Sequence, residues 1–229
     1  MEVYPIFLID LAERRCVVIG GDREAERKVA GLLDRSAQVT VISPALTPQL
    51  HTWSHAGSIT WVAREYAPGD LQEAFLVIAT GREAEINRRI WQEAQAVKAL
   101  LNVVDDPIQS HFIAGSVVRQ GALTLAISTS GCAPALAVRL RQRFAQEFGP
   151  EYAAFLDLMR ELRQPLTARY PDFQTRRERW YALVDSDILA LLRQGQSDRA
   201  RQRAMAILEG TLPESICSPQ HNGDADLQH

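Results

Sequence analysis

Apolar runs that alternate with amphipathic segments along the first hundred residues constrain the fold of this chain more than any other feature. The runs are short and almost continuously apolar, which is typical of strands buried on both faces of a parallel sheet. They lie at residues 16–19, 38–42, 59–62, 74–79 and 100–104. Helix-like segments at 23–33, 47–56 and 83–98 separate them, the first with Ala25, Val29 and Leu32 or Leu33 on one face. The alternation predicts an α/β fold with a Rossmann-like, doubly wound parallel sheet over residues 1–113.

The pattern changes after residue 113. Residues 115–119 and 122–128 predict a β-hairpin, and residues 134–148 predict a helix with Leu136, Leu140 and Phe144 at helical spacing. A hairpin and one helix are too small to have their own core, and exposed strand edges need a partner. We therefore expect residues 114–149 to be a dimerisation segment that pairs with a second copy.

A boundary is predicted at Gly149-Pro150, because no strand-like run follows it. Residues 150–212 carry apolar residues at heptad-like spacing and many arginines, which predicts a small all-α domain. The polar residues 213–229 predict a disordered tail.

Charge and hydropathy exclude two classes of partner. The chain has 25 basic and 28 acidic residues, a net charge of −3, and therefore lacks the basic surface expected for nucleic-acid binding. No run approaches the ~20 apolar residues of a membrane span, and the N-terminus does not have the layout of a signal peptide. A cytoplasmic protein is expected, with no membrane and no nucleic-acid partner.

Cysteines and histidines give no metal-binding pattern. Cys16, Cys132 and Cys217 are far apart and odd in number, which indicates neither a disulfide framework nor a metal site. Cys16 and Cys132 are expected to be buried or partly buried small residues. His51 and His55 are spaced i, i+4 without a third ligand, which favours a helix surface and no metal site.

The basic residues are almost all arginine, since Lys28 and Lys98 are the two lysines among the 25. Genomic base composition is one explanation. The other is a ligand that carries several carboxylates, which arginine forks bind well. Both explanations stay open.

The turn after the first strand stands where a G-x-G-x-x-G/A dinucleotide fingerprint belongs. Gly20 and Ala25 supply its first and third positions, but Asp22 takes the second. A side chain there would crowd a diphosphate, and a carboxylate would repel it unless it turns away or pairs with Arg23. A simple glycine-rich turn is the alternative. The second strand ends in Ser43-Pro44 instead of an acidic residue, so a ribose contact would come from the hydroxyl or the backbone.

Two acidic residues follow the fifth strand, at the sheet edge where ligands of doubly wound folds bind. Asp106 precedes Pro107 and is predicted to form a turn. Asp105 directly follows the strand and is the better candidate for a general base.

A hydroxyl-rich and glycine-rich loop, residues 128–131, opens the helix at 134. Such a loop can hold an anion with backbone N–H groups, or Ser130 can simply cap the helix, and both remain open. Arg139, Arg141 and Arg143 follow as cations for an acidic ligand, and His111 is a further candidate contact.

These residues together resemble the N-terminal module of siroheme synthases. The resemblance rests on YPIFLIDLAERRCVVIGG from Tyr4, AERK from Ala25, AFLVIAT from Ala74, INRRI from Ile86, NVVDDP from Asn102 and LTLAISTSGCAPALAVRLR from Leu123. It covers residues 4–163 well and the remaining helical domain loosely.

The resemblance implies a homodimer that oxidises precorrin-2 to sirohydrochlorin with NAD⁺ and, in bifunctional members, also inserts Fe²⁺. Asp105 corresponds to the family's catalytic aspartate. The eight carboxylates of the tetrapyrrole are groups that the arginines would bind. The residues expected to bind NAD are Gly20, Gly21, Asp22, Arg23, Glu24, Ser43, Pro44, Ala45 and Thr80. Those expected to bind substrate are His111, Ser128, Thr129, Ser130, Gly131 and Arg139.

The chain departs from the family pattern at several positions. Asp22 replaces a third glycine, Gly81 an acidic or amide residue, Ala114-Gly115 an apolar-Pro pair and Cys132 a small polar or basic residue. No methyltransferase domain is expected to follow. Two alternatives therefore stay open: a chelatase whose NAD site has decayed, and a non-catalytic tetrapyrrole-binding protein.

Overall fold

The structure, a computed structural model, describes residues 3–211. The described chain divides into two compact units that meet between Ala114 and Gly115. The tail predicted at 213–229 lies outside the described residues. No helix within the described range is long and apolar enough to cross a membrane.

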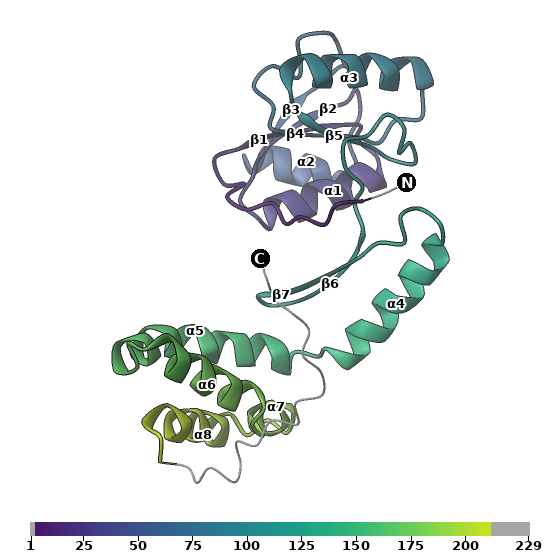
Figure 1. The fold of residues 1–229 in the computed structure, drawn as a ribbon. Helices are drawn as coiled ribbons and strands as arrows, with labels where there is room; N and C mark the ends of the chain where they lie inside the picture. Colours follow the sequence, from purple (N-terminus) through teal and green to yellow (C-terminus); the bar gives the residue numbers. More distant parts are fainter. Residues whose placement is uncertain (1–2, 212–229) are drawn as a thin grey trace. The chain divides into compact units, whose positions relative to one another are not determined.

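The first unit is a five-stranded parallel sheet with the order β3-β2-β1-β4-β5 (Figure 1). Its strands are β1 (Arg15–Ile19), β2 (Gln38–Ile42), β3 (Ile59–Val62), β4 (Leu76–Ala79) and β5 (Leu100–Val103), and its helices are α1 (Arg23–Leu33), α2 (Pro48–His55) and α3 (Ala84–Val97). The predicted Rossmann-like α/β fold is confirmed. Because β2 and β4 flank β1 on opposite sides, the chain changes direction between β1 and β4, which is where ligands bind in such sheets.

Neighbouring residues of each strand face opposite sides of the sheet and build two separate cores. Val18 belongs to one core with Val29 of α1 and Leu50 of α2, whereas Val17 belongs to the other with Ile90 of α3. Figure 1 shows the same layering, with α1 and α2 on one side of the sheet and α3 on the other. The apolar stripes predicted for these helices are thus the faces that they bury.

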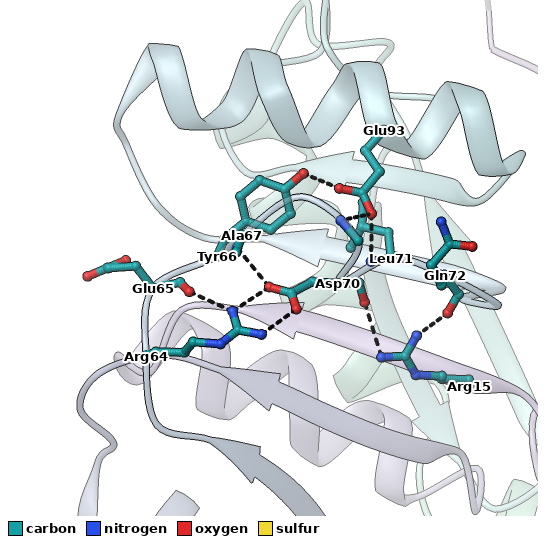
Figure 2. Close-up of polar contacts among 10 residues, drawn as sticks. Arg15, Arg64, Glu65, Tyr66, Ala67, Asp70, Leu71, Gln72 and Glu93 are labelled. Atoms are coloured by element: carbon teal, nitrogen blue, oxygen red, sulfur yellow. Dashed lines mark hydrogen bonds and ion pairs between the residues drawn. The ribbon is translucent and has the colours of Figure 1, made fainter.

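The loop of residues 63–75 between β3 and β4 crosses to the opposite end of the sheet and is held by charged side chains (Figure 2). The Arg64 guanidinium donates two hydrogen bonds to the Asp70 carboxylate, at 2.7 and 2.6 Å. These bonds hold the pKa of Asp70 below its ordinary value. Arg15, at the start of β1, donates to the backbone oxygens of Asp70 and Gln72.

Glu93 of α3 fixes the same loop from the other side. One of its carboxylate oxygens accepts hydrogen bonds from the backbone N–H groups of Gly69 and Leu71, at 3.1 and 2.9 Å. The other accepts from the Tyr66 hydroxyl. Burial and this carboxylate raise the pKa of Tyr66, so the phenol stays protonated and keeps donating.

The chain that follows β5 returns along the outer edge of the strand. Val103 and Asp106 form an antiparallel bridge, and the backbone N–H of His111 donates to the carbonyl oxygen of Leu101 at 2.7 Å. The Leu101 N–H donates to Nδ1 of His111, and the Val103 N–H to Oγ of Ser110. The outward-facing backbone groups of β5 are therefore all paired.

The second unit contains the predicted antiparallel hairpin followed by helices. Its elements are β6 (Ser116–Gln120), β7 (Leu123–Ile127), α4 (Pro134–Glu147), α5 (Glu151–Arg169), α6 (Phe173–Val184), α7 (Ile188–Arg193) and α8 (Ser197–Glu209). Its apolar core joins α5 to α8 through residues such as Leu166, Leu183 and Ile188. The unit boundary at residues 149–150 stays a prediction.

The hairpin and α4 bury little within the described residues. Ala137 is the buried residue of α4, whereas Leu136 is half exposed despite its predicted apolar spacing. Cys132 is exposed, so its predicted burial is wrong. Cys16 is buried as predicted, and burial raises the pKa of its thiol to about 11.

Candidate functional site

The turn after β1 lies at the carboxyl edge of the sheet, beside the end of β4. Gly20 has a φ of +123°, and a Cβ there would lie 2.1 Å from Oγ1 of Thr80. A Cβ on Gly21 would lie 1.9 Å from the carbonyl oxygen of Ala45 and 2.6 Å from Oγ of Ser43. Both positions therefore require glycine, and the turn brings the ends of β1, β2 and β4 together.

Asp22 is the N-cap of α1. Its Oδ1 accepts a hydrogen bond from the backbone N–H of Ala25 at 2.9 Å, and the Thr80 hydroxyl lies 3.3 Å from the same oxygen. Thr80 has one O–H and shares it between Asp22 and the carbonyl oxygen of Ile19, 3.4 Å away. The carboxylate turns onto its own helix, and no Asp22–Arg23 ion pair exists within residues 3–211.

The loop after β2 is fixed by its own polar groups. The buried Ser43 hydroxyl donates to the carbonyl oxygen of Ala45 at 2.7 Å, and Trp61 Nε1 donates to the carbonyl oxygen of Ser43 at 2.9 Å. Pro44 lies exposed between them. The Thr47 hydroxyl caps α2 by accepting from the Leu50 N–H. This loop is therefore rigid where it faces the turn after β1.

The structure thus brings Gly20, Gly21, Asp22, Ser43, Ala45 and Thr80 together at one edge of the sheet. Arg23 follows directly on α1 and is exposed. Glu24 is already engaged, since its carboxylate pairs with Arg27 and with Lys28 at 3.3 Å. A dinucleotide diphosphate needs glycines at a helix N-terminus, at the point of the sheet where the chain changes direction. Gly20 and Gly21 meet this need, so these residues fit NAD apart from the carboxylate of Asp22.

Asp105 lies at the same edge, one residue beyond the point where the Val104 N–H donates to the carbonyl oxygen of Ala79 at 2.9 Å. Its φ is +64°, and its side chain is exposed. Asp adopts this left-handed conformation more readily than most residues. The Asp105 carboxylate interacts electrostatically with Lys28 of α1. Burial and Arg27 lower the pKa of Lys28, and the Asp105 carboxylate raises it.

Asp106 has the turn role predicted for it. Its Oδ1 accepts hydrogen bonds from the backbone N–H groups of Ile108 and Gln109, at 3.1 and 3.2 Å. The two adjacent carboxylates therefore differ in their hydrogen bonds, because Asp106 accepts backbone N–H groups of its own loop and Asp105 does not.

His111 is positioned by β5, and its Nδ1 is occupied by the Leu101 N–H at 3.2 Å. Its Nε2 is the ring nitrogen left for a ligand. A substrate contact by His111 stays a prediction.

The hydroxyl-rich loop belongs to the second unit, between β7 and α4. Ser130 has a φ of +52° and does not cap α4, whose N-cap is Ala133. The Thr129 hydroxyl instead accepts from the Ala133 N–H at 3.3 Å, and Ser128 Oγ accepts from the Ser130 N–H at 3.1 Å. Gly131 and Arg139 are exposed. A common substrate site of these residues with Asp105 stays a prediction.

Sequence reasoning missed two side chains near this edge. One is Lys28. The other is Asn87, which is buried at the start of α3, donates to the carbonyl oxygen of Gly81 at 3.0 Å, and has no partner for Oδ1. Asn87 lies on the buried stripe of α3 with Ile90 and Ala94, so a polar residue in an apolar pattern was the available signal.

Three family models match successive parts of the chain. The family described as "Putative NAD(P)-binding" matches residues 7–116, the "Sirohaem biosynthesis protein central" model matches 120–147, and the "Sirohaem synthase dimerisation region" matches 151–208. Over residues 7–208 the chain is therefore similar to proteins of siroheme synthesis. Its first unit is the part that matches the NAD(P)-binding model.

Relatives support the same assignment. The chain is 37% identical over 205 residues to siroheme synthase 3 of Aeromonas hydrophila, which covers 89% of this chain and 44% of the relative. It is 37% identical over 210 residues to the siroheme synthase of Methylobacillus flagellatus, covering 92% and 45%. The chain thus spans less than half the length of these curated relatives.

A solved structure, SirC, a precorrin-2 dehydrogenase, has the same fold. It superposes with a TM-score of 0.72 and 21% identity, over 89% of this chain and 99% of that one. At this identity the likeness supports the fold of the module.

Proposed function

We propose that this chain is an NAD⁺-dependent precorrin-2 dehydrogenase of siroheme biosynthesis, acting in the cytoplasm as a homodimer. The observation that carries the proposal is the position of Asp105. Its exposed carboxylate lies at the same sheet edge as the glycine turn of the unit that matches the NAD(P)-binding model. A base beside a dinucleotide site is what a dehydrogenation that releases a proton requires.

Bound NAD⁺ would supply the hydride acceptor. Gly20 and Gly21 would let the backbone approach its diphosphate, and the loop that Ser43 fixes would flank its ribose. Asp105 would accept a proton from the macrocycle as the hydride leaves. Since the Asp105 side chain accepts no hydrogen bond within the described residues, both of its oxygens are available for this role.

The substrate would bind through cations and hydroxyls. A tetrapyrrole with eight carboxylates suits Arg139 and its neighbours on α4, and the hydroxyls of Ser128, Thr129 and Ser130 and the backbone of Gly131 would contact one of these carboxylates. In the first unit, His111 would contact substrate through Nε2.

A homodimer is supported by the dimerisation model at 151–208. Our prediction placed the interface at 114–149, where α4 exposes Leu136 and Val138. The two stretches differ, and the position of the interface stays a prediction. Light scattering coupled to size-exclusion chromatography tests the dimer, and a monomeric mass would contradict it.

Ferrous-iron insertion into sirohydrochlorin is a second candidate function. The Asp22 carboxylate at the dinucleotide turn favours it, because a chelatase needs no NAD⁺. Asp105 would then accept pyrrole N–H protons, and Fe²⁺ would be a substrate.

An anaerobic assay separates these functions. Precorrin-2 is incubated with and without NAD⁺, sirohydrochlorin is separately incubated with Fe²⁺ or Co²⁺, and absorbance spectra are recorded. We expect sirohydrochlorin to form only with NAD⁺. Metal insertion without NAD⁺-dependent oxidation would favour the chelatase, and a bound chromophore with neither reaction would indicate a binding protein.

A further inference from the structure

The N-terminus of α1 already holds an anion that belongs to the chain. The Asp22 carboxylate accepts the Ala25 N–H at 2.9 Å and lies 3.3 Å from the Thr80 hydroxyl. Both donors face the turn after β1, where the diphosphate of a dinucleotide would bind. A phosphate oxygen that enters this turn would be repelled by the Asp22 carboxylate, which is also negatively charged. The carboxylate also occupies the two hydrogen-bond donors that the phosphate would use.

The other carboxylates of the first turn are engaged elsewhere. Glu24 pairs with Arg27 and Lys28, and Glu26 accepts from the Thr47 hydroxyl at 2.5 Å. Asp22 is thus the carboxylate of this turn that points to the end of β4.

We propose that Asp22 is an internal competitor that sets the affinity of this chain for NAD⁺. It stabilises α1 as an N-cap and weakens diphosphate binding at the same helix end. The proposal rests on the proposed function, which supplies the dinucleotide. It assigns Asp22 a negative contribution to binding, opposite to that of the glycines beside it.

Asp22→Asn separates charge from capping. Asn has an oxygen that can accept the Ala25 N–H and is as good an N-cap as Asp, but it carries no charge. We expect NAD⁺ to bind about 10- to 1,000-fold more tightly to this variant, with an unchanged melting temperature, because the repulsion between like charges a few ångströms apart spans this range between bulk water and a protein surface. Binding is measured by titration calorimetry on the full chain without substrate.

Asp22→Gly removes both the charge and the cap. We expect a similar or larger gain in affinity, with a lower melting temperature. Asp34→Asn is the matched control, since it removes one charge from the exposed C-cap of the same helix, and its affinity should equal that of the wild type. The gain from Asp22→Asn should shrink at high salt, because salt screens the repulsion.

Unchanged or weaker NAD⁺ binding by a folded Asp22→Asn variant would overturn this role of Asp22, even if the wild type oxidises precorrin-2 with NAD⁺. An equal gain from Asp34→Asn would overturn it too, because the effect would then be one of net charge. If neither the wild type nor the two Asp22 variants bind NAD⁺, the proposed dehydrogenase function fails with it.

Discussion

The two ends of the five-stranded sheet hold their loops in different ways. At the end where β1 and β4 begin, side chains of the loop at 63–75 and of α3 pair with one another (Figure 2). At the end where β1, β4 and β5 finish, the turn consists of Gly20 and Gly21, and Asp105 has a positive φ and an exposed side chain. Polar groups at the first end therefore stabilise the sheet through pairs between the loop and α3. At the other end Asp22, Ser43 and Thr80 also bond to the chain, whereas the Asp105 carboxylate makes no hydrogen bond within the described residues and is available for a ligand.

The largest expected effect is at Asp105. Asp105→Asn should lower the rate of NAD⁺-dependent precorrin-2 oxidation about 10²–10⁴-fold, since a general base contributes this much, while the affinity for NAD⁺ is kept. Initial rates under anaerobic conditions check the prediction. Asp106→Asn is the control, because Asn can still accept the N–H groups of Ile108 and Gln109. Equal rates for wild type and Asp105→Asn would refute the role of Asp105.

The next effect concerns the glycine turn. Gly20→Ala should lower the free energy of unfolding by about 2–4 kcal/mol, because Ala is strained at this φ and its Cβ would overlap Oγ1 of Thr80. Urea denaturation measures the change, and NAD⁺ binding should weaken as the turn shifts.

Gly31→Ala is a matched control inside α1. A Cβ there meets nothing within 4 Å, so Ala should raise the free energy of unfolding by about 0.5–1 kcal/mol. A Gly20→Ala variant as stable as Gly31→Ala would show that the turn tolerates a side chain.

At the opposite end of the sheet, Glu93→Ala should lower the free energy of unfolding by about 1–3 kcal/mol, since it leaves the N–H groups of Gly69 and Leu71 without their acceptor. Its affinity for NAD⁺ should not change. Glu85→Ala on the same helix removes only an exposed pair with Arg88, and its stability should stay close to that of the wild type. A loss of NAD⁺ affinity in folded Glu93→Ala would break the separation between the two ends.

The smallest effect is a pH dependence. Because Arg64 lowers the pKa of Asp70 in the folded chain, this pair adds stability that is fully present above the ordinary pKa of Asp, about 3.9, and is lost as the pH falls through the lower folded value. Arg64→Met should therefore melt below the wild type at neutral pH, and the difference should narrow below about pH 4. A difference independent of pH would mean that Arg64 acts through packing alone.

Much of the first unit could be predicted because its signals are local. The buried strand at 16–19 has continuous apolar residues, and α2 starts at a Thr47-Pro48 pair that specifies a cap. The N-cap role of Asp22 also has a local signal, because an Asp directly before an amphipathic segment is a typical helix start.

The hydrogen bonds and electrostatic interactions that could not be predicted join residues far apart in sequence. Tyr66 and Glu93, or Lys28 and Asp105, have no local pattern that pairs them, because the sheet order brings them together. The exposure of Leu136 on α4 could not be predicted for a different reason, since helical periodicity identifies an apolar face without saying what covers it.

The returning chain beside β5 has a consequence for how copies of the first unit can associate. Since the outward groups of Leu101 and Val103 are paired with Ser110 and His111, another copy cannot add a strand there. The edge of β3 is left as the other end of this sheet. Edge-to-edge growth through this sheet would stop at two copies, because an endless fibre needs two open edges on every copy.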